Sequence, residues 1–415
     1  PAAQRFKAKV RAQLPEPPAA NLSKEEHAAH LLEQMEYVFD EWIHLCNNPH
    51  ATERAAMIFV HQLHSVQLVT NRDEFLLFLR HALDKSVERF EQGIHSGASI
   101  AESFQAVEAL VKLIIIFVKS HQDSEDKDPS AAVAFMDSIL ALGVLVANSH
   151  HVKRGENFNQ RVFYRFFALL LHEVGLLAGH FSKSHYEQII LNFAARLFDM
   201  RPNLLPGFAC AWAGLVSHRA FLPVILGLPD EKGWAPFTKL LEQFLGCVGE
   251  LVKTFTVSSL GKEMYHAALK ILIVLQHDFP IYLDKFRVQL CQSLPLHATQ
   301  LVNLILAAIP PNCNSLADPF QAGLKVDKIP DMKERPPTAF DSAGLLREAG
   351  LLDILERMLQ NGPSEDGVAQ INHAINKSDG ESTSFGYVPL GVNRRLIDAV
   401  VARFAEFAIN RASSR

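Results

Sequence analysis

Apolar residues recur at intervals of three and four through most of the 415-residue chain, and this spacing is the strongest constraint on its fold. The stretch from Thr70 to Phe90, "TNRDEFLLFLRHALDKSVERF", is typical. Its apolar positions share one face of a helix, while Asp73 and Glu74 suit the first turn because a helix N-terminus carries partial positive charge. Strict two-residue alternation over strand length is hard to find. The pattern therefore predicts an all-α protein.

Helices of similar length are predicted one after another, with links of a few residues between most of them. The predicted ranges are 24–46, 51–68, 71–92, 98–120, 130–148, 157–179, 184–200, 204–228 with breaks, 234–256, 259–277, 279–292 and 297–309. Short links favour antiparallel neighbours, and helix pairs of about 40 residues stack into an α-solenoid of HEAT or armadillo type. No residue-level repeat supports this prediction, so a compact, irregular helical domain is the alternative.

Composition changes mark the predicted domain organisation. We expect an N-terminal extension at 1–23 and a HEAT-like helical domain at 24–360, with an extended, proline-rich strap at 310–340. Residues 361–386 are rich in small and polar side chains, which predicts a mobile insertion. A C-terminal helix is expected within 387–415, in a domain that continues beyond this fragment.

Charge and cysteine content exclude several classes of protein. Forty basic and forty-five acidic residues leave a net charge of -5, which argues against a globally basic surface for nucleic acid. The five cysteines are far apart and form no CxxC pair, so neither a disulfide framework nor a thiolate zinc site is indicated. The apolar run Ala131–Ala147 contains Asp137 and is shorter than the roughly 20 residues of a membrane span. We expect a buried helix there and a reducing cytoplasm or nucleus around the protein.

His277 and Asp278, in "LQHDFPIYLDKF", form the most suggestive pair for catalysis. They stand where one predicted helix stops and the next begins, with Pro280 suited to the first turn of the second helix. Asp278 is the predicted cap of that helix, and His277 lies near the negative end of the preceding one. The end of one helix and the start of the next explain both residues, so we expect them to stabilise the corner between these two helices.

Other chemical motifs are incomplete. "LHEVGLLAGH" begins like a zinc-protease helix at His172 and Glu173, but position 176, where the second histidine should stand, is Leu176, and His180 is two turns away from His172. The pairs His27/His30 and His61/His64 would each need a third metal ligand from elsewhere. Phosphate-binding loops and dinucleotide fingerprints do not occur in the sequence. We therefore predict no enzyme, no catalytic residues, no metal and no cofactor.

Several unusual strings between residues about 205 and 330 resemble a known family. They are "AWAGLVSHRAFLPVIL", "KGWAPFTKLLEQFL", "ALKILIVLQHDFPIYL", "LVNLILAAIP" and "DPFQAGLKVD", in this order. Together they resemble the C-terminal domain of Not-one, the scaffold subunit of the carbon catabolite repression/negative on TATA-less (CCR-NOT) deadenylase complex. The upstream helices, 24–200, are similar in pattern and length.

The resemblance implies a stack of HEAT-like helix pairs without enzymatic activity. Its implied partners are extended segments of the Not-two and Not-three/five subunits and, in fungi, a tail of the Not-four ubiquitin ligase. It also implies roles in mRNA decay, translational repression and transcription regulation, in the cytoplasm and nucleus. A membrane partner is not expected.

Partner binding is expected at exposed aromatic and long basic side chains, because these dominate protein interfaces. We predict Trp234, Phe237, Phe320 and Lys325 as partner-binding residues. The alternative is that all four pack inside the domain. Two other functions stay open: a helical-repeat RNA-binding module, for which "HHVKRG" and "KVDKIPDMKER" are short candidates, and an enzyme of unfamiliar type.

Overall fold

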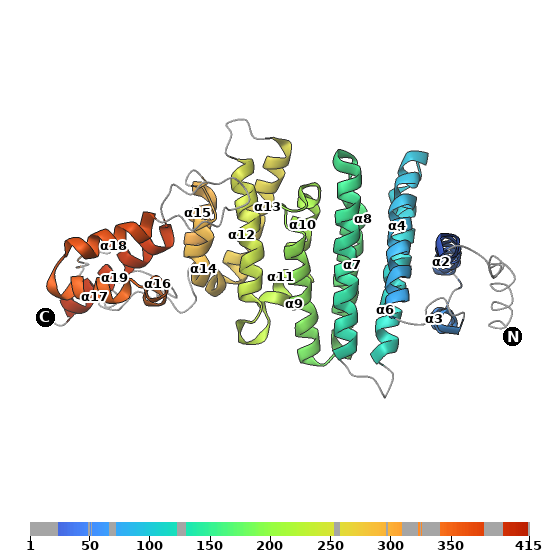
Figure 1. Cartoon of the computed structure of the whole chain (residues 1–415), viewed down its shortest axis with the longest axis horizontal. Coiled ribbons are helices and arrows are strands. Elements are labelled where there is room, and N and C mark those ends of the chain that lie inside the picture. Colours follow the sequence, from blue (N-terminus) through green and yellow to red (C-terminus); the bar gives the residue numbers. More distant parts are fainter. Residues whose placement is uncertain are drawn as a thin grey trace. The chain divides into compact units, whose positions relative to one another are not determined.

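The computed structural model describes residues 24–48, 50, 52–65, 72–122, 130–252, 258–295, 298–308, 323, 325, 341–376 and 393–413. These residues form α-helices and short 3-10 helices, with no strand among them (Figure 1). The predicted all-α class is therefore confirmed. Most helices begin and end within a few residues of their predicted bounds.

The chain divides into two compact units, Pro1–Pro236 and Phe237–Arg415. The boundary between the units falls in the first turn of helix α12, Trp234–Leu251, within the range 24–360 of the predicted helical domain. Helices in a stack bury residues mainly against their neighbours. A stack can therefore divide at a point that the local helical pattern does not mark.

Unit 1 contains ten α-helices among its described residues. They are α2 (Lys24–Asn47), α3 (Glu53–Ser65), α4 (Arg72–Ser96), α5 (Ile100–Ser103), α6 (Gln105–Gln122), α7 (Ser130–Arg154), α8 (Gln160–Leu176), α9 (Lys183–Asp199), α10 (Ala209–Val216) and α11 (Leu222–Leu226). The last two, separated by non-helical residues, correspond to the prediction of a broken helix at 204–228.

The long helices of unit 1 form two adjacent rows. Helices α4, α7, α9 and α11 contact one another in sequence, and so do α6, α8 and α10. Contacts between α4 and α6 and between α7 and α8 join the rows, and consecutive long helices run antiparallel (Figure 1). This arrangement confirms the predicted stack of antiparallel pairs, whereas the HEAT type remains a prediction.

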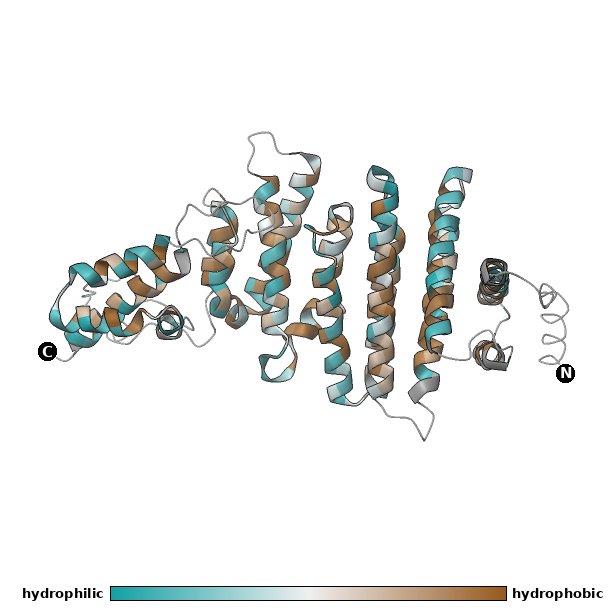
Figure 2. Cartoon of the chain, viewed as in Figure 1, coloured by the Kyte–Doolittle hydropathy of each residue, from teal (hydrophilic) through white to brown (hydrophobic). Residues whose placement is uncertain are grey.

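Burial follows the sequence periodicity in unit 1. In α4 the apolar residues that recur at intervals of three and four are buried: Phe75, Leu79, Ala82, Leu83, Val87 and Phe90. Phe75 packs on Phe117 of α6, with ring centroids 4.1 Å apart. Figure 2 shows the corresponding separation of hydrophobic and hydrophilic residues along the helices. Hydrophobic burial thus selects the faces that the spacing of three and four defines.

Helix α7 is long and apolar enough to cross a membrane by length and composition. It lies, however, against α4, α6, α8 and α9. Its Asp137 receives two hydrogen bonds from Arg196 of α9, of 3.0 and 3.1 Å. These contacts support the prediction of a core helix, because a lipid-facing helix would present apolar side chains around its surface.

Unit 2 contains most of α12 and seven further helices among its described residues. They are α13 (Ser259–Asp278), α14 (Pro280–Gln292), α15 (Thr299–Leu306), α16 (Ser342–Glu348), α17 (Leu352–Asn361), α18 (Glu365–Asn376) and α19 (Arg394–Ser413). Helices α13, α14 and α15 contact one another, while α16, α17 and α18 all contact α19. Ser258 caps α13, since its Oγ accepts the N–H of Gly261 at 3.1 Å. Leu260 of the first turn is exposed.

Part of the predicted mobile insertion at 361–386 is helical. Residues 365–376 form α18, and Ile371 is buried with Leu346, Leu351, Leu355, Leu396 and Ala399. The composition of this segment does not indicate a helix, because few of its residues are buried. The buried stripe consists of Gly367 and Ile371 with the half-buried Ala374 and Ile375. Residues 377–386 lie outside the described part, as do 1–23 and, apart from Gly323 and Lys325, the predicted strap. The C-terminal helix is confirmed as α19.

Candidate functional site

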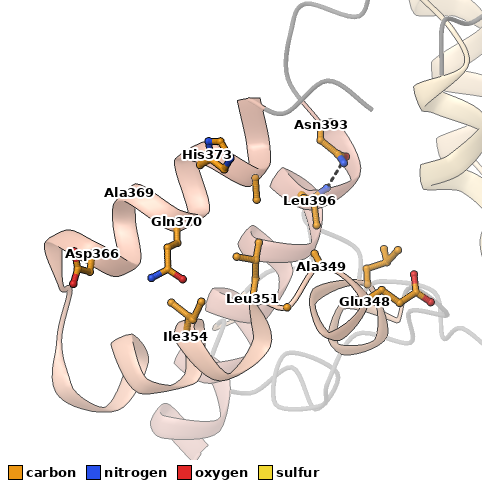
Figure 3. Close-up of a pocket in the computed structure, with 13 residues that line it drawn as sticks. Glu348, Ala349, Leu351, Ile354, Asp366, Ala369, Gln370, His373, Asn393 and Leu396 are labelled. Atoms are coloured by element: carbon orange, nitrogen blue, oxygen red, sulfur yellow. Dashed lines mark hydrogen bonds between the residues drawn. The ribbon is translucent and has the colours of Figure 1, made fainter. Parts of the chain in front are cut away.

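A groove opens in unit 2 where α18 passes over α16, α17 and the start of α19 (Figure 3). Its volume is about 760 Å³. We call it the α18 groove and define it by an apolar floor and a polar rim. The floor contains Leu345, Leu351, Ile354 and Leu396, and the rim contains Glu348, Asp366, Gln370, His373 and Asn393.

Two glycine turns place α17 and α18 around this groove. Gly350, with φ of 69°, ends α16, and the N–H of Leu351 then bonds to the carbonyl oxygen of Leu346 at 2.8 Å. Gly362, with φ of 95°, follows α17. Positive φ favours glycine because it has no Cβ to clash. Ser364 then starts α18 by accepting the N–H of Gly367 at 3.2 Å.

The floor is an accessible extension of the hydrophobic core. Leu351 and Leu396 are buried members of the core cluster, and Leu345 and Ile354 are half-buried residues packed against it. In Figure 3 the side chains of Ile354 and Gln370 point toward each other across the groove, from α17 and α18. A ligand would therefore meet aliphatic surface below and an amide above.

The rim combines fixed and unoccupied polar groups. Asn393 is fixed, because its Oδ1 accepts the N–H of Leu396 at 3.2 Å and its own N–H donates to the carbonyl oxygen of Ile375 at 2.6 Å. Gln370 and His373 are exposed, and their side chains bond to no other described residue of the chain. These two side chains are therefore available to a ligand.

Two carboxylates lie at opposite ends of the groove in Figure 3, Glu348 at the end of α16 and Asp366 on α18. Neither forms an ion pair with another described residue, and the described residues that line the groove include no lysine or arginine. Elsewhere in unit 2, Glu356 and Glu406 both bind Arg403, at 2.5 and 2.9 Å, and hydrogen bonding to Glu356 raises the pKa of that guanidinium. The rim is thus a local site of uncompensated negative charge.

A second, smaller cleft of about 430 Å³ lies in unit 1 along α6 and α8. Its apolar lining includes Val111, Ile115 and Ile116, which are almost completely buried. On its rim Arg165 donates to Glu108 at 3.0 Å, so these charges already compensate each other. The α18 groove presents more accessible apolar surface and more unoccupied polar groups, and we take it as the candidate site.

Comparisons with known proteins place the chain in a family. The sequence profile described as "CCR4-Not complex component, Not1" matches residues 171–415, more than half of the chain. The chain belongs to the Not1 family. This confirms the resemblance that the sequence strings indicated.

Curated relatives of this Not1-family chain are much longer than the chain itself. It is 28% identical over 387 residues to General negative regulator of transcription subunit 1 of Saccharomyces cerevisiae, covering 89% of this chain and 18% of the relative. It is 28% identical over 350 residues to the protein of the same name from Schizosaccharomyces pombe, covering 84% and 16%. The chain therefore spans less than a fifth of the length of these relatives.

Two solved structures share the fold. The NOT1 superfamily homology domain from Chaetomium thermophilum is 96% identical with a TM-score of 0.85, over 94% of this chain and 74% of that one. A Not1 C-terminal domain in complex with Not4 is 27% identical with a TM-score of 0.72, over 92% and 76%. A solved relative thus has a bound protein partner.

Three of the four residues predicted to bind partners in this Not1-family chain lie among the described residues. Trp234 is half-buried, and its indole N–H donates to the carbonyl oxygen of Leu226 at 2.9 Å. Phe237 is 0% exposed and packs edge-on against Tyr282, so it belongs to the core. Lys325 is exposed, and Phe320 lies outside the described residues. Neither Trp234, Phe237 nor Lys325 lines the α18 groove.

His277 and Asp278 occupy the corner between α13 and α14, as predicted, but Asp278 does not cap α14. Phe279 takes the N-cap position without a side-chain hydrogen bond, because helix α13 continues through Asp278. The carboxylate of Asp278 instead lies 2.6 Å from His277 Nδ1. Pro280 begins α14, as predicted. His277 is 87% exposed, so the pair lies on the surface and in neither groove.

The histidines of the incomplete motifs are distributed over separate elements. His172 and Glu173 lie on α8, and His180 is in a 3-10 turn after it. The pairs His27/His30 and His61/His64 lie on α2 and α3. Within the described residues, no three histidine, cysteine or acidic side chains are grouped to hold a metal.

Sequence reasoning missed the polar residues of the α18 groove. Gln370 and His373 lie within residues 361–386, which were predicted from their composition to be a mobile insertion. The available signal was the spacing of Gly367, Ile371 and Ala374, together with the serine before Glu365 that suits a helix cap. Even that signal predicts only a helix, because the groove requires α16, α17 and α19 to meet it.

Proposed function

We propose that this Not1-family chain is a noncatalytic scaffold domain of the CCR4-Not mRNA deadenylation complex. It docks other subunits and so acts in mRNA decay, translational repression and transcription regulation, in the cytoplasm and nucleus. The proposed partners are segments of Not-two and Not-three/five and the tail of Not4. Partner binding to a related Not1 C-terminal domain supports the proposal.

The α18 groove is the observation that carries the proposal to this chain. The half-buried Leu345 and Ile354 offer apolar surface at the edge of a packed core that includes Leu351 and Leu396. Gln370 and His373 add hydrogen-bonding groups that the chain itself does not use. Apolar surface bordered by polar groups is typical of sites that bind another protein segment.

Co-purification tests this function. The chain would be co-expressed with tagged segments of Not-two, Not-three/five or the Not4 tail, and each pair would be analysed by size-exclusion chromatography. We expect at least one segment to elute with the chain in a stoichiometric complex. Absence of binding to all three, with the chain folded and with a longer Not1 chain giving the same result, would overturn the proposal.

RNA binding is measured in the same series by fluorescence anisotropy with a labelled single-stranded adenylate oligonucleotide. We expect no binding at protein concentrations that saturate a Not segment, because the net charge is -5 and phosphate contacts dominate nucleic-acid affinity. Salt-sensitive RNA binding without binding of any Not segment would favour the helical-repeat RNA-binding alternative.

A further inference from the structure

We infer that the α18 groove binds an extended peptide segment in which an aliphatic side chain is flanked by lysine or arginine. This inference rests on the proposed scaffold function and names the chemistry of the segment that one site accepts. It is carried by the groove's floor, its unoccupied amide and imidazole groups, and the unpaired carboxylates on its rim.

The floor selects an aliphatic anchor. It is lined by Leu345, Leu351, Ile354 and Leu396, and the part of the chain that the structure describes adds no phenylalanine, tyrosine or tryptophan to it. Burying apolar side chains against this surface removes water from both partners, which is the main favourable contribution to association. The volume of about 760 Å³ falls in the range of pockets that enclose a compact ligand, so it accepts a few side chains of a segment.

The polar groups favour an extended segment over a helix. Gln370 and His373 stand one helical turn apart on α18, and both line the groove. The Gln370 amide offers donors and an acceptor, and the neutral imidazole of a histidine offers one of each. An extended chain has backbone N–H and C=O groups that need such partners, whereas the middle of a helix satisfies its own.

The charges of the rim select basic flanks. Glu348 and Asp366 lie at opposite ends of the groove in Figure 3 and form no ion pair with a described residue. A segment lying along the groove would bring its flanking residues near these carboxylates. Lysine or arginine at those flanks gains attraction, and acidic flanks are repelled. The same rim disfavours a nucleic-acid phosphate backbone.

Peptide selection tests the inference directly. A phage-displayed library of random dodecamers is panned on the intact chain, and each enriched peptide is synthesised with a fluorophore for anisotropy. We expect enrichment of Leu, Ile or Val with neighbouring Lys or Arg. Selected peptides without this composition, all competing for the groove, would contradict the inference.

Two tryptophan variants establish where the peptides bind. Ala369→Trp places a bulky ring on a residue that lines the groove, and Val368→Trp places the same ring on an exposed neighbour that does not. We expect Ala369→Trp to weaken peptide binding at least about tenfold by occlusion, and Val368→Trp to change it less than about twofold. Equal effects of the two variants would overturn the placement.

Charge reversal tests the rim with a matched control. The pair Glu348→Lys and Asp366→Lys reverses the groove's carboxylates, and Asp353→Lys with Glu365→Lys makes the same charge change on exposed residues of α17 and α18 that do not line it. We expect the first pair to weaken basic peptides several-fold more than the second, with the difference shrinking at high salt. Equal weakening would reject the charge selection.

The two proposals fail in different ways. If a Not segment binds the parent chain and the Ala369→Trp variant equally well, the scaffold function stands and the segment binds outside the α18 groove. Selected peptides that bind the groove while no Not segment binds the chain would keep the site and reject the scaffold function. Thermal unfolding of each variant confirms beforehand that it is folded.

Discussion

The side-chain hydroxyls of Thr238 and Tyr282 lie 2.9 Å apart in the core of unit 2, between α12 and α14. Both side chains are buried, and burial raises the pKa of the Tyr282 phenol well above its usual range. This hydrogen bond satisfies two polar groups that water does not reach. It also fixes how the two helices meet beside Phe237, which packs on the Tyr282 ring.

We expect Tyr282→Phe to lower the free energy of unfolding by about 1 kcal/mol, because the buried hydrogen bond to Thr238 is lost. Thr238→Val should cost a similar amount. The double variant should cost clearly less than the sum of the two, since either single variant already removes the hydrogen bond that they share. Urea unfolding of the four proteins measures this, and strict additivity would contradict a direct interaction.

Acid should destabilise unit 1 through His81. Burial is the main cause that lowers the pKa of His81, although Glu36, Asp84 and Glu88 oppose it. The unfolded histidine, with a pKa near 6.5, therefore takes up a proton more readily than the folded one. Stability is retained above pH 6.5 and falls as the pH drops from there toward the folded-state pKa.

Urea unfolding between pH 7.5 and pH 5.5 checks this dependence. His81→Gln should make stability less sensitive to pH over this window, because it removes the group that the unfolded state protonates preferentially. An unchanged pH dependence in the folded variant would show that another group, such as His218, whose pKa burial also lowers, dominates the response.

The turn before α12 should not tolerate a side chain at Gly233. A Cβ there would lie 1.9 Å from the carbonyl oxygen of Ile225, which is part of α11. We expect Gly233→Ala to lower the free energy of unfolding by about 3 kcal/mol, because backbone atoms would have to move. Gly179→Ala is the control, since a Cβ there meets nothing within 4 Å. Equal thermal unfolding temperatures of the two variants would contradict the close contact between Gly233 and Ile225.

Helix α18 should be protected from amide exchange because Ile371 attaches it to the core of unit 2. Ile371→Ala is expected to lower the free energy of unfolding by about 2–4 kcal/mol and to reduce protection across 365–376. Val368→Ala, at an exposed position of the same helix, should stay within about 0.5 kcal/mol of the parent chain. Hydrogen exchange read by mass spectrometry distinguishes these results. Rapid exchange of α18 in the parent chain would favour the mobile insertion that composition predicted.

The amino-acid sequence by itself determined the helical class, the approximate bounds of most helices and the family. Apolar spacing is a local property, so Phe75, Leu79 and Leu83 define a buried face without reference to any other helix. Caps are local too, since Ser258 accepts the N–H of Gly261 only three residues further on. Family strings lie within single segments and need no fold to be compared.

Tertiary structure decided which surfaces remain open. Phe237 and Trp234 follow the same stripe of α12, yet the first is completely buried and the second is only half-buried. Asp278 satisfies the sequence rule for a cap of α14, but it is the last residue of α13. Its carboxylate therefore lies against His277. The α18 groove exists because residues from α16, α17, α18 and α19 meet in space. Sequence spacing specifies the faces of one helix, whereas the packing of neighbouring helices decides which of those faces stay in contact with water.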